Sequence, residues 1–288
     1  MVTNNWRVVI GLTCCLLTAP GATWGAVAFD RSMAPVHLSS AGRARRPLLG
    51  TDELDRLRDV LAGTDQTAIL AAIQALGDGG AGNAAPLLVE GLAGGAPAPV
   101  TGAAIDALKK LRDPTSVEVL ALYAGNRGPE IRKHAVEALG IFADGRVVPV
   151  LMDRLGDAVA DVRGAAAQAL ATRGEKAATP RMLALLRRND AAVAGPLGAL
   201  APIALLSEIS ELRGGITDDN LATTLGELLK RRDVPESERM EIVKTLSGIP
   251  GPAATTALIE YVGMLSPQDR RASRFEAQRS VDERAKQP

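Results

Sequence analysis

The residue types that carry most enzyme and metal chemistry are scarce in this chain. It contains two histidines and two cysteines: His37, His134, Cys14 and Cys15. No G-x-S-x-G sequence is present, and no acidic residues have the spacing of a calcium-binding loop. His134 follows Lys133 in a predicted helix, where we expect it to be solvated on the outer side. We therefore expect no catalytic, cofactor-binding or metal-binding residue, and no enzyme activity.

One segment, residues 77–82, satisfies the G-x-G-x-x-G pattern of dinucleotide-binding loops. That motif requires a strand before it, so that the pyrophosphate meets a helix N-terminus at a sheet edge. Residues 69–76 instead have helical spacing, so we interpret the glycines as a turn. The pairs Asp218-Asp219 and Arg187-Arg188 are predicted to start and to end helices, respectively, where the helix dipole favours each charge.

The first 28 residues have the pattern of an export signal. Arg7 precedes an apolar run over residues 8–19, and Ala26 and Ala28 are small residues at the positions that a signal peptidase requires. We expect cleavage after Ala28 and a periplasmic or extracellular protein. The alternative is an uncleaved membrane anchor over residues 8–28. Cleavage removes both cysteines, which leaves no disulfide and no thiolate ligand.

Composition and charge narrow the classes of partner. The chain is 47% apolar but only 2% aromatic, a balance typical of closely packed helices rather than a sandwich or barrel. Residues 51–265 carry 22 basic and 28 acidic side chains, a net charge of −6, whereas residues 29–50 and 266–288 are basic. An acidic body repels phosphate backbones, so we expect no nucleic-acid partner.

A leucine-centred pattern recurs along the chain with spacings of 32, 31, 31 and 30 residues. An alanine precedes each leucine, and further small or branched residues stand three, four and eight positions before it. These offsets lie on one face of a helix, and alanine allows neighbouring helices to approach closely. The five leucines are Leu76, Leu108, Leu139, Leu170 and Leu200.

A second apolar helix is predicted after each leucine-centred helix. Pro86, Pro149 and Pro180 each lie ten residues beyond their leucine, in or near the first turn, where proline is tolerated. A hairpin of this length cannot bury its own apolar face, so successive hairpins must stack. We predict an all-α solenoid of about six hairpins, with the second helices lining its inner surface.

Residues 129–155 and 160–186 resemble HEAT repeats, in particular the short HEAT-like repeats of phycobilisome lyases. Glu130-Ile131-Arg132 and Asp161-Val162-Arg163 match the opening of that repeat, and Ala-Leu followed by a turn and a proline matches its continuation. The resemblance covers residues 64–188 well and 189–265 loosely. It implies a concave surface that binds another protein. Some HEAT-like enzymes hold a di-iron centre through His-Glu pairs, which this chain lacks.

The predicted organisation has four parts: a signal peptide (1–28), a flexible basic linker (29–50), the solenoid (51–265) and a charged C-terminal tail (266–288). Residues 51–61 are predicted to form an N-terminal capping helix. An extra helix over residues 217–231 is predicted to separate Leu200 from a sixth unit centred on Leu246. From Pro267 onward we expect a frayed helix or a disordered tail.

We therefore predict an exported, non-catalytic scaffold that binds a protein partner through its concave face. The alternatives are a lyase-like or chaperone accessory to an enzyme, and a membrane-tethered scaffold if the N-terminal segment is not cleaved. Polar residues on the second helices are the predicted contacts, namely Asp153, Arg154 and Arg181. The sequence leaves the identity of the partner and the oligomeric state open.

Overall fold

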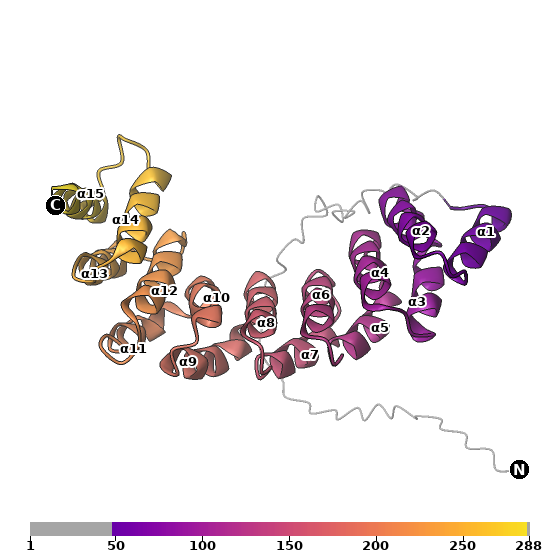
Figure 1. Ribbon diagram of the computed structural model, residues 1–288. Helices are drawn as coiled ribbons and strands as arrows, with labels where there is room; N and C mark the ends of the chain where they lie inside the picture. Colours follow the sequence, from indigo (N-terminus) through magenta and orange to yellow (C-terminus); the bar gives the residue numbers. More distant parts are fainter. Residues whose placement is uncertain (1–47, 287–288) are drawn as a thin grey trace, which may run out of the picture. The chain divides into compact units, whose positions relative to one another are not determined.

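Stacked helical hairpins make up the part of the chain that the structure, a computed structural model, describes, residues 48–286 (Figure 1). The described residues belong to one compact unit, and the predicted signal peptide and most of the linker lie outside them. The α-helices are α1 (Thr51–Leu61), α2 (Gln66–Gly79), α3 (Ala85–Ala93), α4 (Ala98–Leu111), α5 (Ser116–Tyr123), α6 (Pro129–Gly140), α7 (Val147–Arg154), α8 (Ala160–Thr172), α9 (Thr179–Arg187), α10 (Ala194–Leu200), α11 (Leu206–Ser210), α12 (Asp218–Lys230), α13 (Glu236–Ser247), α14 (Pro252–Met264) and α15 (Ala272–Ala285).

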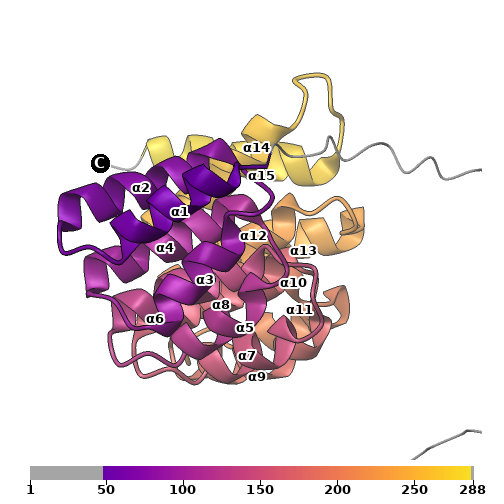
Figure 2. The ribbon, with the colours of Figure 1, turned by 90° about the vertical axis from the view of Figure 1, so that its right-hand side faces the viewer.

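The predicted all-α solenoid is confirmed, and the predicted capping helix is α1. The remaining helices within residues 48–286 pair into seven hairpins, from α2–α3 to α14–α15, where about six were predicted. The first helices of the hairpins form one layer and the second helices form the other (Figures 1 and 2). None of these described helices is long and apolar enough to cross a membrane.

Local sequence accounts for where the hairpins begin and turn. Pro86, Pro149 and Pro180 lie within the first three residues of α3, α7 and α9, as predicted, where their missing N–H removes no helical hydrogen bond. Gly80 ends α2 in the left-handed conformation, with φ of 63°. Gly77 and Gly79 belong to α2 itself, so the G-x-G-x-x-G segment is the end of a helix and its turn.

Glycine and alanine set the spacing of the first layer. A Cβ placed on Gly140 would lie 2.8 Å from the Cβ of Ala169, so α6 and α8 touch nearly backbone to backbone. Gly77 meets Ala107 in the same way, as does Gly226 with Ala257. In each contact the glycine follows a buried leucine and the alanine precedes one. The first helices can therefore approach more closely than larger side chains would allow.

The second helices lie on the outer side of the bend, so the prediction that they line the inner surface is wrong. Within residues 48–286, α4, α6, α8 and α10 lie on the inner side, and α5, α7 and α9 lie outside them (Figure 1). The sizes of the buried side chains agree with this direction of bending. The first helices meet through glycine and alanine, whereas the second helices bury larger side chains such as Leu151, Met182 and Leu186.

The register beyond Leu200 also differs from the prediction. Gly195-Pro196 restricts α10 to Ala194–Leu200, and Gly198 packs against Thr224, so the repeat continues through Leu197, Leu225 and Leu258. Ala199 is consequently exposed. The predicted extra helix is α12, the first helix of its own hairpin, and Leu246 lies in α13, a second helix.

The C-terminal segment is a packed helix, which corrects the prediction of a frayed or disordered tail. Helix α15 buries the small residues Ser273, Ala277 and Ser280 against the preceding hairpin. The hydroxyls of Ser273 and Tyr261 are 2.6 Å apart and buried. Arg284 donates to the carbonyl oxygens of Leu246 at 2.8 Å and Ile249 at 2.7 Å. A buried face made of serine and alanine has little hydrophobic periodicity, which is why the sequence pattern missed it.

Candidate functional site

A groove on the inner layer lies between α6 and α8 and has a volume of about 560 Å³. Its walls are mostly small side chains, and its margins carry both signs of charge. Lys109 forms an ion pair with Glu137 at 3.8 Å, and Lys133 and Asp161 lie nearby. The small residues of the groove are Gly140, Ala160, Gly164, Ala165, Ala169 and Ala192. This surface can receive a polypeptide segment close to the helix backbones.

His134 is half-buried between α4 and α6, which corrects the prediction of a solvated residue. The imidazole lies beside Gly102 of α4, where a Cβ would be in ordinary contact at 3.6 Å from Nδ1. The Nδ1 atom is buried without a hydrogen-bond partner. Within residues 48–286, no three His, Cys, Asp or Glu side chains are grouped closely enough to hold a metal ion.

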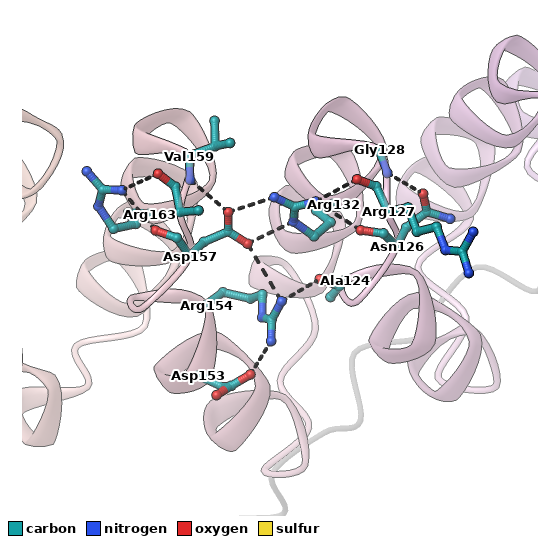
Figure 3. Close-up of polar contacts among 11 residues, drawn as sticks. Ala124, Asn126, Arg127, Gly128, Arg132, Asp153, Arg154, Asp157, Val159 and Arg163 are labelled. Carbon is teal, nitrogen blue, oxygen red and sulfur yellow. Dashed lines mark hydrogen bonds and ion pairs between the residues drawn. The ribbon is translucent and has the colours of Figure 1, made fainter.

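Two arginine–aspartate pairs link successive hairpins through the loops that precede α8 and α10. Arg132 donates through Nε and Nη2 to the carboxylate of Asp157, both at 2.8 Å (Figure 3). Arg163 donates through Nε to Asp190 at 2.6 Å. Each aspartate also accepts a backbone N–H two residues further along, at 3.0 Å and 3.1 Å. These pairs connect successive repeats.

Hydrogen bonding lowers the pKa of Asp157, chiefly through the Arg132 side chain and with a further contribution from the backbone N–H of Val159. Burial acts in the opposite direction. The hydrogen bond that Arg132 donates to Asp157 raises the pKa of Arg132 in turn. Both groups therefore stay charged in the folded protein. The triplets Glu130-Ile131-Arg132 and Asp161-Val162-Arg163 marked both arginines, but the aspartates that pair with them lie 25 and 27 residues later.

The three predicted contact residues border one depression of about 410 Å³, although it is not on the inner layer. Asp153 and Arg154 end α7, and Arg181 lies in the first turn of α9. Arg154 is hydrogen-bonded to Asp153 and donates to the carbonyl of Ala124 at 3.3 Å (Figure 3). The structure thus brings the three together at the loop edge of the outer layer.

This stacking of paired helices defines an α-solenoid, and comparison with known proteins specifies its class. A family model for HEAT repeats matches residues 85–171 and 122–195. The chain contains HEAT repeats, as its sequence pattern predicted, and the matches extend from α3 into α10.

Two solved structures are among those similar to this chain. One is the complex of CpcE and CpcF of phycocyanin lyase from Nostoc sp. PCC7120, with 16% identity and a TM-score of 0.45, covering 84% of this chain and 97% of that chain. The other is an engineered protein, with 22% identity and a TM-score of 0.33, covering 80% and 95% of the respective chains. No curated protein matches the chain in sequence.

Proposed function

We propose that this chain is a non-catalytic scaffold that binds a protein partner through the inner layer of its solenoid. The groove between α6 and α8 is the observation that carries the proposal. HEAT-type stacking generates a long surface in which each hairpin contributes one exposed strip. Binding through the inner face was predicted from the sequence, with contacts on the second helices; we now propose that the contacts lie on the first helices of that face.

A protein suits the groove better than a small ligand because the surface is open and its charges are mixed. Gly140 and Gly164 bring the backbones of α6 and α8 to the surface, so a partner segment can pack closely. Lys133 and Asp161 offer opposite charges on the two helices. Complementary charges of both signs provide specificity and register between two polypeptides.

A non-catalytic role agrees with the partners of the ionisable groups whose pKa values are shifted. The pKa values of Arg132, Asp157 and Arg163 are shifted, and each of these groups is engaged in an ion pair between hairpins. Groups committed to such pairs remain charged and are poor proton donors and acceptors near neutral pH.

Site-specific photo-crosslinking tests the proposed surface. A benzophenone amino acid replaces Gln168, an exposed residue of the groove, in the full-length chain expressed in its native cells. The matched control places the same probe at Leu122, which is 72% exposed on α5 of the outer layer. We expect a discrete protein adduct from position 168 that is absent from position 122. Equal adducts from both positions, or none from position 168, would contradict the proposal.

We further propose that the scaffold works outside the cytoplasm after loss of residues 1–28. Ala26 and Ala28 support this proposal. Fractionation followed by N-terminal sequencing tests it, and the expected first residue of the exported form is Phe29. A membrane-associated chain that retains Met1 would favour the tethered alternative. A cytoplasmic chain that retains Met1 would instead favour a lyase-like or chaperone accessory role.

A further inference from the structure

The depression beside α7 combines three guanidinium groups with two carboxylates. We call it the arginine pocket, defined by Arg132, Asp153, Arg154, Asp157 and Arg181. Its formal charge is +1. The solenoid as a whole is acidic, so this positive charge is confined to the pocket. The question is which of these groups remain available to a ligand.

Arg132 and Asp157 are fully used by each other and by the loops. The Asp157 carboxylate accepts Nε and Nη2 of Arg132 as well as the backbone N–H of Val159. Arg132 Nη1 donates to the carbonyl oxygens of Asn126 and Arg127, each at 3.0 Å (Figure 3). The two side chains are only 13% and 4% exposed. This pair lines the pocket and is neutral overall, so the excess positive charge of the pocket belongs to the other residues.

Arg181 is the available cation. It is exposed, and its guanidinium makes no hydrogen bond or ion pair within residues 48–286. Its Nη2 lies 2.7 Å from the point where a Cβ on Gly156 would stand, so the glycine allows the guanidinium to lie over the α7–α8 loop. Arg154 lies on the same pocket, held by Asp153 and the Ala124 carbonyl and 3.6 Å from Asp157.

Asn126 also lines the pocket and adds a neutral donor. Its Oδ1 accepts the backbone N–H of Gly128 at 2.8 Å. This hydrogen bond occupies the Oδ1 atom, so the Nδ2 group is the part of the amide that can donate a hydrogen bond to a ligand. Arg181 and Asn126 thus present unused donors, and the carboxylate oxygens of Asp157 face Arg132 and Arg154 instead.

We propose that the arginine pocket binds a carboxylate carried by an acidic segment of the partner. The planar guanidinium fork of Arg181 matches a carboxylate in two-point geometry. One excess positive charge balances one monoanion, whereas a phosphate dianion would meet repulsion from Asp153 and from the acidic solenoid. That the carboxylate belongs to a protein rests on the proposed function.

Peptide titration of the full-length protein at low salt tests the pocket directly. The probes are a fluorescent, terminally blocked Gly-Gly-Glu-Glu-Gly-Gly peptide, its Gln-Gln counterpart and inorganic phosphate as a competitor. We expect the glutamate peptide to bind and the glutamine peptide not to. Loss of a charge-assisted fork should weaken the glutamate peptide by about tenfold or more in Arg181→Ala, with partial recovery in Arg181→Lys.

Arg232→Ala is the matched control, because Arg232 is also an exposed arginine without a side-chain hydrogen bond within residues 48–286. Its affinity should stay within about twofold of the parent, as expected for a distant surface charge. Equal affinity of the Arg181→Ala and parent proteins would overturn the proposal, and so would inorganic phosphate that displaces the glutamate peptide at a lower concentration than acetate, the second competitor, does. The titration needs no partner, so a failed crosslink at position 168 and a failed titration are distinguishable.

Discussion

At the scale of single residues, the arginine of the repeat's opening triplet forms a pair with an aspartate of a later loop. These arginine–aspartate pairs link successive hairpins. Asp157 lies in the loop before α8 yet is bonded to Arg132 of α6. Its carboxylate is nearly buried, so its charge is compensated only by that guanidinium, the Val159 N–H and the nearby Arg154. Removing one partner of such a pair costs more than the hydrogen bonds alone, because the remaining charge is left without compensation.

Asp157→Asn is expected to lower the free energy of unfolding by about 2–4 kcal/mol at neutral pH. The folded pKa of Asp157 lies below its unfolded value, so its stabilisation is complete above pH of about 4 and is lost as pH falls through the folded pKa. Urea unfolding at pH 7 and pH 3 should therefore show a smaller acid loss in the variant.

The control for this comparison is Asp106→Asn, at an exposed residue without a side-chain hydrogen bond or ion pair within residues 48–286. It should unfold like the parent at both pH values. An acid loss of stability in Asp157→Asn as large as that of the parent would show that this carboxylate does not contribute to the acid sensitivity.

At the scale of the helices, one position after the buried leucine decides how closely neighbours approach. It is glycine in α2, α6, α10 and α12, as Gly77, Gly140, Gly198 and Gly226 show. In α4 and α8 the corresponding residues are Lys109 and Ala171. Glycine therefore alternates with a larger residue at this position from α2 to α10, whereas the successive first helices α10 and α12 both carry glycine. Because these glycines lie in helices, their role is to leave space for the neighbouring helix and not to allow an unusual backbone conformation.

Gly140→Ala and Gly91→Ala should have effects of opposite sign. A Cβ at Gly140 would meet the Cβ of Ala169 at 2.8 Å, so we expect a loss of about 1–3 kcal/mol through overpacking. A Cβ at Gly91 of α3 would meet nothing within 4 Å, so better helix propensity should stabilise by about 0.5–1 kcal/mol. Thermal melting measures both, and a stabilised Gly140→Ala protein would rule out a tight contact between α6 and α8.

At the scale of the whole described unit, each hairpin is covered by its neighbours, so the ends need separate solutions. Helix α1 covers the first hairpin, and its apolar residues are only half-buried. At the other end, Ile259 stands where α12 carries Gly226 and is 51% exposed. A bulky side chain at this position prevents another hairpin from packing as closely as the internal ones do. Helix α15 then completes the last hairpin.

Truncation after Ser266 should unfold the end of the stack and leave its centre intact. Without α15, Tyr261 loses the hydroxyl of Ser273, and the carbonyls at the end of α13 lose Arg284. Since repeats are stabilised chiefly by their neighbours, we expect amide exchange in α13 and α14 to accelerate by about tenfold or more and exchange in α6 and α8 to change by less than about twofold. Hydrogen-exchange mass spectrometry measures this, and uniform acceleration would indicate a single cooperative unit instead.

The helices, their pairing and their buried faces were predictable from the sequence as far as α9, because an apolar period of 3.6 residues and a first-turn proline are properties of adjacent residues. Three features emerged only from the folded chain: the first helices lie inside the bend, Asp157 pairs with Arg132, and α15 is packed. Each of these depends on distances between helices of different hairpins. Such distances depend on which side chains of neighbouring helices contact each other. At Gly195-Pro196 the contacting residues shift by about one helical turn, and the apolar period of the sequence does not mark this shift.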